Sequence, residues 1–302
     1  MPHAKTALFV ALGIVTLGFA AYWFVAAHRR RGASAWPRRV HVAIGVITNF
    51  FDTLGIGSFA PTTSIFKLRR LVPDELIPGT LNVGHALPTI TQAFIFIAIV
   101  EVDITTLAGM IAASVIGAWL GAGVVAGLPR RRVQIGMGLA LIAAASFFAM
   151  TNLGLFPAGG DTLGLSSPLL WVGLAGNFVL GALMSLGIGL YAPCMILVAL
   201  LGMNPRAAFP IMMGSCAFLM PVGSLRFIAN GSYSHAASVG LALGGIPAVF
   251  VAAFVVKSLP LTALRWLVVA VVLYAAFSML RSARAEKKGA PADAVSRPTA
   301  GR

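Results

Sequence analysis

A carboxylate inside an apolar segment is the first feature of this sequence that suggests chemistry. Asp52 lies deep in a run of apolar residues, where a charged carboxylate costs on the order of 3 kcal/mol in a bilayer. It either takes up and releases a proton during function or ties a broken helix together, and the sequence leaves both interpretations open. His85, near the middle of the next apolar segment, either shares a proton with Asp52 or is a buried histidine bonded to a neighbouring carbonyl. Asp52 and His85 are therefore our candidates for proton coupling.

The residues after Asp52 form a motif that occurs twice. Residues 54–61 read LGIGSFAP and residues 186–193 read LGIGLYAP, at an offset of 132 positions. Glycine and proline break a helix, and a broken backbone within a bilayer normally lines a cavity or a site. The helix that begins at each break would point its N-terminus, which attracts anions, towards the membrane centre. The pattern therefore predicts a site for a small anionic substrate between the two breaks.

Polar and small residues in and beside the two breaks are the candidates for contact with this substrate. They are Asn49, Thr53, Gly55, Gly57, Ser58, Pro61, Thr62, Thr63, Asn82, Gly187, Gly189, Tyr191, Pro193, Cys194, Ser215 and Cys216. The two cysteines either meet a sulfur-containing substrate or pack as small apolar side chains, and packing is favoured. They have no C-x-x-C spacing, and no histidines pair at ligand spacing, so we expect no metal site and no cofactor.

The composition places these breaks in a membrane protein. Of the 302 residues, 59% are hydrophobic and 10% are charged, whereas a soluble domain carries about a quarter charged residues. The net charge of +14 comes from short basic clusters between apolar runs, which is typical of cytoplasmic loops. Because no basic surface interleaved with aromatic residues is visible, we expect the lipid bilayer, and not nucleic acid, to be a partner. The sequence does not indicate an oligomeric state.

Apolar runs and charge clusters together predict the path of the chain through the membrane. Residues 40–66 and 168–203 are interrupted by the motif, and each is predicted to enter and return on one side as a re-entrant hairpin. Full spans are predicted at residues 6–27, 76–100, 104–128, 133–151, 207–229, 236–256 and 261–280. This path places the N-terminus outside and the C-terminus in the cytoplasm. Of the 22 Lys and Arg residues, it leaves only Lys5, Arg206, Lys257 and Arg265 outside, as the preference of basic residues for the cytoplasmic side requires.

The duplication extends beyond the motif and predicts the fold. Further prolines recur at the same offset or within a residue of it: Pro78 with Pro210, Pro88 with Pro221, and Pro129 with Pro260. Each unit holds one hairpin and three spans, an odd number of crossings, which forces the two copies into opposite orientations. We therefore predict an all-α integral membrane protein with two inverted repeats, preceded by one extra N-terminal transmembrane helix. The predicted parts are the N-terminal helix with its basic loop (1–39), the first repeat (40–151), an external linker (152–167), the second repeat (168–281) and a disordered cytoplasmic tail (282–302).

The duplicated motif, the two-halved layout and the separating linker resemble the sulfite exporter TauE/SafE family, also called the toluenesulfonate uptake permeases. The resemblance covers roughly residues 40–280, is carried by residues 55–61 and 187–193, and leaves the first helix outside. It implies a permease for small anions, such as sulfite, sulfonates, sulfoacetate or related organic acids, in the bacterial inner membrane. It supplies no residue motif for the substrate, so the site residues above follow from position alone.

Three functions are compatible with these features. The favoured one is a secondary transporter of a small anion driven by the proton gradient, because no nucleotide-binding motif points to ATP. A passive anion channel is the second. The third is an intramembrane hydrolase with Ser58 as nucleophile and His85 as base, but the second copy of the motif has Leu190 where Ser58 stands. We therefore do not expect an enzyme.

Overall fold

The computed structural model describes residues 2–29, 36–125, 130–155, 160–184 and 189–289, and every regular element in these ranges is helical. The α-helices are α1 (Pro2–Arg29), α2 (Arg39–Thr53), α3 (Phe59–Arg69), α4 (Ile77–Ile99), α5 (Ile104–Val125), α6 (Arg130–Asn152), α7 (Leu169–Met184), α8 (Tyr191–Leu200), α9 (Ala208–Asn230), α10 (His235–Ser258) and α11 (Leu261–Gly289). Two short 3₁₀ turns, η1 (Asp74–Leu76) and η2 (Pro205–Ala207), precede α4 and α9.

Five stretches of the described chain are long and apolar enough to cross a membrane. They are Ala4–Arg29, Asp74–Ile99, Pro205–Asn230, His235–Ser258 and Trp266–Ala285. The helices α5 and α6 begin and end near two further predicted spans, but their described apolar stretches, Ile104–Leu120 and Gln134–Ala143, are shorter. The chain is thus an all-helical, multi-pass membrane protein.

The first copy of the motif separates two helices. α2 ends at Thr53 and α3 begins at Phe59. Between them Gly55 and Gly57 have φ angles of +96° and +88°, a left-handed backbone that glycine adopts without steric strain. Pro61 is the third residue of α3, where its missing N–H has no intrahelical acceptor to lose. The motif therefore acts locally, as a helix end followed at once by a helix start.

The second copy is also flanked by helix ends. α7 ends at Met184 and α8 begins at Tyr191, with Pro193 again as the third helical residue. Gly187, one of the candidate site residues, lies with its neighbours 185–188 outside the described residues. The equivalent starts of α3 and α8 follow from the same Pro position in the two copies.

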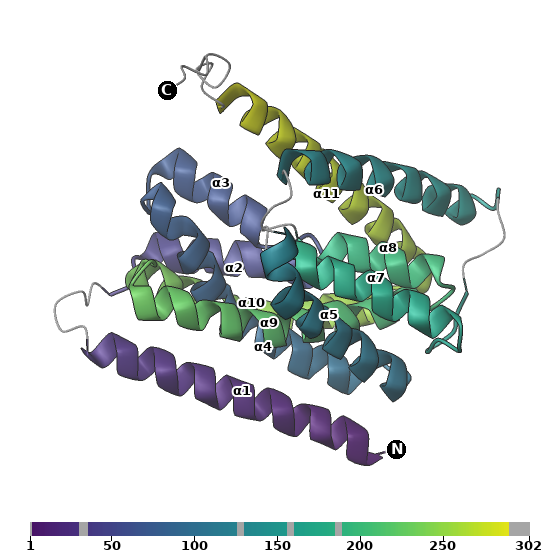
Figure 1. Cartoon of the computed structure of the whole chain (residues 1–302), viewed down its shortest axis with the longest axis horizontal. Helices are drawn as coiled ribbons and strands as arrows, with labels where there is room; N and C mark the ends of the chain where they lie inside the picture. Colours follow the sequence, from purple (N-terminus) through teal and green to yellow (C-terminus); the bar gives the residue numbers. More distant parts are fainter. Residues whose placement is uncertain (1, 30–35, 126–129, 156–159, 185–188, 290–302) are drawn as a thin grey trace, which may run out of the picture.

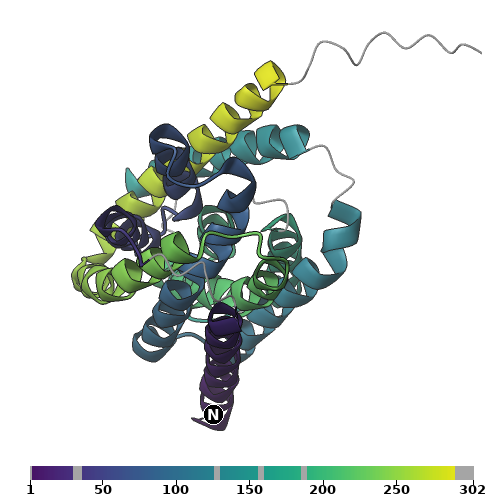
Figure 2. The ribbon, with the colours of Figure 1, turned by 90° about the vertical axis from the view of Figure 1, so that its left-hand side faces the viewer.

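Four helix pairs make up most of the bundle: α2 with α10, α5 with α7, α4 with α9, and α6 with α11. Figure 1 shows α2 and α3 towards one end of the bundle and α7 and α8 towards the other. The helix α1 lies on the periphery, as Figures 1 and 2 agree, and contacts chiefly α9 and α4. The start of α1 and the end of α11 lie at opposite ends of the bundle in Figure 1.

Glycines let two of these pairs approach to backbone contact. A Cβ atom added to Gly45 of α2 would lie 2.6 Å from the Leu241 carbonyl oxygen of α10. A Cβ atom at Gly117 of α5 would overlap the carbonyl oxygen of Phe178 in α7. Small residues at such contacts are typical of helix packing within membranes, where close backbone approach supplies the attraction.

The loops gather at the two ends of the bundle. At one end three hydrogen bonds join them: Asp103 N–H to Leu163 O, Asn204 N–H to Thr162 O, and Arg206 Nη2 to Leu259 O. All of these loops are ones that the charge pattern assigns to the outside.

At the opposite end, Arg131 Nε of α6 donates to Ala283 O of α11 at 3.2 Å. The Ser234 N–H, just before α10, donates to Thr80 Oγ1 of α4 at 2.9 Å. These segments are ones that the charge pattern assigns to the cytoplasm, so the structure groups the loops as the sequence does.

Candidate functional site

Asp52 is buried at the end of α2, with 4% of its surface exposed. Its Oδ2 atom accepts a hydrogen bond of 2.8 Å from Gln92 Nε2 of α4. The hydroxyl and the backbone N–H of Ser58, the residue before α3, also bond to this carboxylate. Asp52 therefore joins the two sides of the first break, as the structural interpretation of this residue requires.

Gln92 connects the first break to the second. Its Nε2 atom also donates to Thr53 Oγ1 at 3.0 Å, and its Oε1 atom accepts a hydrogen bond of 2.8 Å from the Tyr191 hydroxyl. Tyr191 is the first residue of α8, and Thr89, one turn before Gln92, also bonds to it. A continuous line of buried hydrogen bonds thus runs from Asp52 through Gln92 to Tyr191.

His85 holds a second polar contact beside the first break. Its Nδ1 atom lies 3.0 Å from Asn49 Oδ1 of α2, and its Nε2 atom lies 3.2 Å from Thr62 Oγ1 of α3. His85, Asn49 and Thr62 each have no exposed surface. In the described part of the chain His85 forms no hydrogen bond with Asp52 or Ser58. His85 thus ties α2 and α3 to α4, and it does not bond directly to Asp52, with which it shares a proton in one of its two possible roles.

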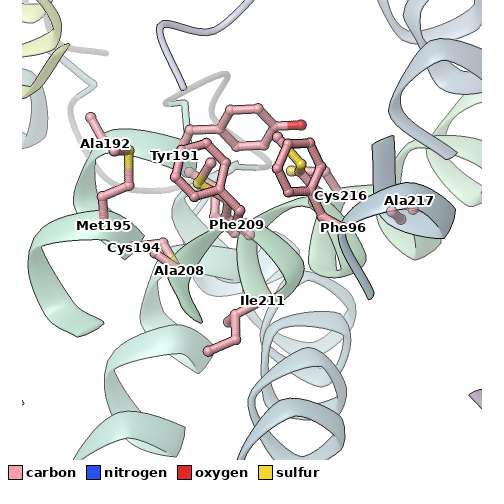
Figure 3. Packing of buried hydrophobic residues seen from close by; sticks show 14 of the residues in the cluster. Phe96, Tyr191, Ala192, Cys194, Met195, Ala208, Phe209, Ile211, Cys216 and Ala217 are labelled. Atoms are coloured by element: carbon pink, nitrogen blue, oxygen red, sulfur yellow. The ribbon is translucent and has the colours of Figure 1, made fainter. Parts of the chain in front are cut away.

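The second break contributes mainly sulfur and aromatic side chains. Cys216 Sγ lies 3.7 Å from Met184 Sδ, and Cys194 is fully buried. In Figure 3 these cysteines lie among packed apolar side chains, with the Tyr191 hydroxyl directed to the side of Cys216. A Cβ atom at Gly55 would lie 2.9 Å from Met195 Sδ of α8. The first break therefore touches the helix that starts at the second.

Four of the other candidate residues lie outside this line of hydrogen bonds. Asn82 donates to Pro78 O in its own helix at 2.9 Å. Ser215 bonds instead to Asn177 Nδ2 at 3.2 Å. Thr63 is half-buried, and Gly189 is exposed with no atom within 4 Å of a Cβ added to it. The structure thus brings together only part of the predicted set.

Gln92 and Asn177 are two of the buried polar residues that were not among our candidates. Gln92 belongs to a helix rich in polar residues, and nothing in its local sequence distinguishes it from Thr89 or Thr91. Asn177 is an amide in the otherwise apolar helix α7 and donates to Met110 O at 2.7 Å, which leaves its Oδ1 buried without a partner in the described structure. An isolated amide in an apolar helix was the available signal for Asn177.

A cavity of about 330 Å³ lies beside the first break. It is apolar, and its lining consists of Phe51, Ile56, Pro61, Leu267, Ala270, Val271 and Tyr274. It separates the start of α3 from α11, whereas α8 packs directly on α11. The starts of α3 and α8 therefore differ in how closely α11 packs on them.

Comparison with protein families gives a match to part of the chain. Residues 2–148 match the family model described as Sulfite exporter TauE/SafE. The match includes α1, which the sequence resemblance left outside, and it ends before the second half, which the resemblance included. Neither the comparison with curated proteins nor that with solved structures found a match. The family is one of membrane transporters, and residues 2–148, just under half of the chain, are similar to it.

Proposed function

We propose that this protein is a secondary transporter of a small anion, a sulfur-containing oxyanion, a sulfonate or an organic acid. The proton gradient drives it, and alternating access takes place around a site between the two helix breaks. The family match supports transport of a sulfur-containing anion. The observation that carries the proposal is the buried line from Asp52 through Gln92 to Tyr191, because it links an ionisable group at one break to a donor at the other.

The helix starts at the breaks support an anionic substrate. α3 and α8 begin at Phe59 and Tyr191, and the side chain of the preceding residue, Ser58 or Leu190, caps neither helix. Uncapped N–H groups at a helix N-terminus favour a negatively charged partner. The contact between Gly55 and Met195 keeps the two starts within the same region. An anion between them would meet backbone donors from both halves of the chain.

The helix pairs support inverted repeats with boundaries at residues 40–151 and 168–281. In chain order, helices α2 to α6 of the first unit correspond to helices α7 to α11 of the second. Exchanging the two units therefore converts the α2–α10 pair into the α7–α5 pair, and both pairs make extensive contacts. The same exchange maps α4–α9 and α6–α11 onto themselves. Gly138 of α6 approaches Leu280 of α11, and Arg131 reaches Ala283, so this self-paired couple is antiparallel. That is the relation expected of two units of opposite orientation.

The loop contacts support the proposed sidedness. The loops at the end that includes Asp103 and Asn204 hold few Lys and Arg residues, and those at the end that includes Arg131 hold many. Basic loops face the cytoplasm in most membrane proteins. We therefore place the N-terminus outside and the C-terminus in the cytoplasm, in the inner membrane of a bacterium.

The contacts of His85 favour transport over hydrolysis. A serine hydrolase needs its base within hydrogen-bonding reach of the nucleophile. The Ser58 hydroxyl instead bonds to Asp52. The Nδ1 atom of His85 bonds to Asn49, and its Nε2 atom bonds to Thr62. The enzyme hypothesis therefore has no contact that supports it among the described residues.

Uptake by the purified full-length protein in proteoliposomes tests the proposal. Radiolabelled sulfite, small sulfonates and small carboxylates are supplied with an imposed pH gradient, with and without an uncoupler. We expect accumulation above the external concentration that the uncoupler abolishes. Uptake that only equilibrates, and that the uncoupler leaves unchanged, would establish a passive channel instead.

A further inference from the structure

The amide of Gln92 has one orientation that fits ionised Asp52. An ionised carboxylate can only accept hydrogen bonds, so it must meet the NH₂ side of the amide. Gln92 Nε2 is 2.8 Å from Asp52 Oδ2, and Oε1 then remains for the Tyr191 hydroxyl, which donates to it at 2.8 Å. In this arrangement the Tyr191 hydroxyl hydrogen is committed to Gln92, and the Thr89 hydroxyl, which also bonds to Tyr191, donates its own hydrogen to the Tyr191 oxygen.

Thr53 stabilises the same orientation. Its hydroxyl donates to Asn49 O at 2.7 Å, so the oxygen of Thr53 can only accept from Gln92, and Nε2 lies 3.0 Å from it. A rotated amide would place Oε1 against the Thr53 oxygen with no hydrogen between them. Such a rotation becomes favourable only when another group supplies a donor on that side.

Protonated Asp52 is such a donor. A neutral carboxyl group can donate its O–H to Gln92 Oε1, and the rotated amide then presents Nε2 to the Tyr191 oxygen. The Tyr191 hydroxyl hydrogen must leave Gln92, because Gln92 now donates to it. Tyr191 begins α8, and the side chain of the preceding Leu190 does not cap this helix. The released hydroxyl, carried by the first residue of α8 and lying beside α4, therefore becomes available as a donor.

We propose that Gln92 is the coupling residue of this transporter, a positioning residue whose amide turns when Asp52 is protonated and so releases the Tyr191 hydroxyl to bind the anion. This proposal rests on the proton-driven anion transport proposed above. Asp52 gains a proton from water on one side and returns it on the other, while Gln92 and Tyr191 keep their own hydrogens throughout. Proton binding and anion binding thereby favour each other.

The other titratable groups near Asp52 leave this line undisturbed. Tyr191 of α8 and Cys216 of α9 interact with Asp52 electrostatically, and both are buried. In the described structure the salt bridge joins Lys67 to Asp74 near the bundle end, and no cation pairs with Asp52. The hydrogen-bonding state of Gln92 is thus the direct consequence of the Asp52 charge.

The test compares pH dependence in exchange assays with full-length protein in proteoliposomes. The variants are Gln92→Leu, Tyr191→Phe and the double variant, with Thr91→Val as the matched control, because Thr91 bonds only to Leu87 O in its own helix. The probe is radiolabelled methanesulfonate, whose charge is constant over the pH range used. If the wild type does not take it up, sulfite is used, with its two ionic forms calculated at each pH. The KM for exchange is measured with equal pH on both sides, and accumulation is measured under a pH gradient.

We expect the wild-type KM to fall as the pH is lowered, and the Thr91→Val variant to behave in the same way. In Gln92→Leu the KM should no longer depend on pH, and the pH gradient should no longer drive accumulation although exchange continues. Tyr191→Phe should raise the KM at low pH to its high-pH value. Because both changes interrupt one line, the double variant should lose no more pH dependence than the stronger single variant.

A pH-dependent KM in Gln92→Leu, or additive losses in the double variant, would overturn the role of Gln92. If Gln92→Leu does not fold, Tyr191→Phe decides alone, because it keeps the ring and removes only the hydroxyl. A wild-type protein that shows no gradient-driven accumulation would instead overturn the proposed function, so the two failures are distinguishable.

Discussion

The Tyr191 hydroxyl donates to Gln92 Oε1 at 2.8 Å across 99 positions of sequence. Gln92 in turn holds Asp52 from α4, so this single amide is bonded to residues at both helix breaks. Each residue is buried, and in a low-dielectric interior such bonds are worth more than in water. The two halves of the chain are therefore joined at the proposed site by polar contacts as well as by helix packing.

Replacement of Asp52 with Asn should separate the two interpretations of this carboxylate. Asn can still accept hydrogen bonds from Ser58, so the first break stays tied, but it cannot carry a titrating proton. We expect the purified variant to unfold at nearly the wild-type temperature and to exchange anion, while pH-gradient-driven accumulation disappears. Intact accumulation in Asp52→Asn would remove the proton-coupling role, and a collapsed unfolding temperature would favour a purely structural one.

Replacement of His85 with Ala should destabilise the protein more than replacement of Thr62 with Val. His85→Ala leaves both Asn49 Oδ1 and Thr62 Oγ1 without this partner, and each unpaired buried polar group costs about 1–3 kcal/mol. Thr62→Val removes one of these contacts. Thermal unfolding in detergent measures the difference, with Thr63→Val as the control, since Thr63 forms no side-chain hydrogen bond in the described structure. Equal unfolding temperatures for the His85 and Thr62 variants would show that the Asn49 contact contributes nothing.

Replacement of Gly117 with Ala should weaken the contact between α5 and α7. The added Cβ overlaps the Phe178 carbonyl oxygen, and backbone cannot move aside as a flexible side chain does. We expect a loss of about 1–3 kcal/mol, the usual cost of overpacking, seen as a lower unfolding temperature in detergent. Gly136→Ala in α6 is the matched control, because a Cβ there meets no atom within 4 Å. A Gly117→Ala protein as stable as the control would contradict the close approach.

Thiol labelling tests the orientation of the loops. Arg132 and Ser166 are exposed at opposite ends of the bundle, and a membrane-impermeant thiol reagent can be applied to intact cells that carry Cys at either position. We expect Ser166→Cys to react and Arg132→Cys to react only after the cells are opened. The wild type is the unlabelled control, because Cys194 and Cys216 are buried. Reaction of Arg132→Cys in intact cells would reverse the proposed sidedness and remove a main support of the inverted arrangement.

Local properties of the sequence determined the class of the protein and the position of its first helix break, but not every helix end, because α11 continues to Gly289 through residues predicted as a disordered tail. The apolar runs are long and lack charge, so they predict membrane helices close to those of α4, α9 and α10. Gly55, Gly57 and Pro61 act on the backbone where they stand, which is why the first helix break could be located from the motif alone. The motif also sufficed for the family resemblance, which the match over residues 2–148 confirms.

Only the tertiary structure decided which polar side chains meet. Asp52 and His85 were paired from their depth in neighbouring segments, yet the rotation of α4 turns Gln92 towards Asp52 and His85 towards Asn49 and Thr62. A change of one residue along a helix turns the side chain by about 100°, so depth alone does not tell which residue faces a partner. The bond of Gln92 to Tyr191 depends further on how two distant halves pack, and no local pattern carries that information.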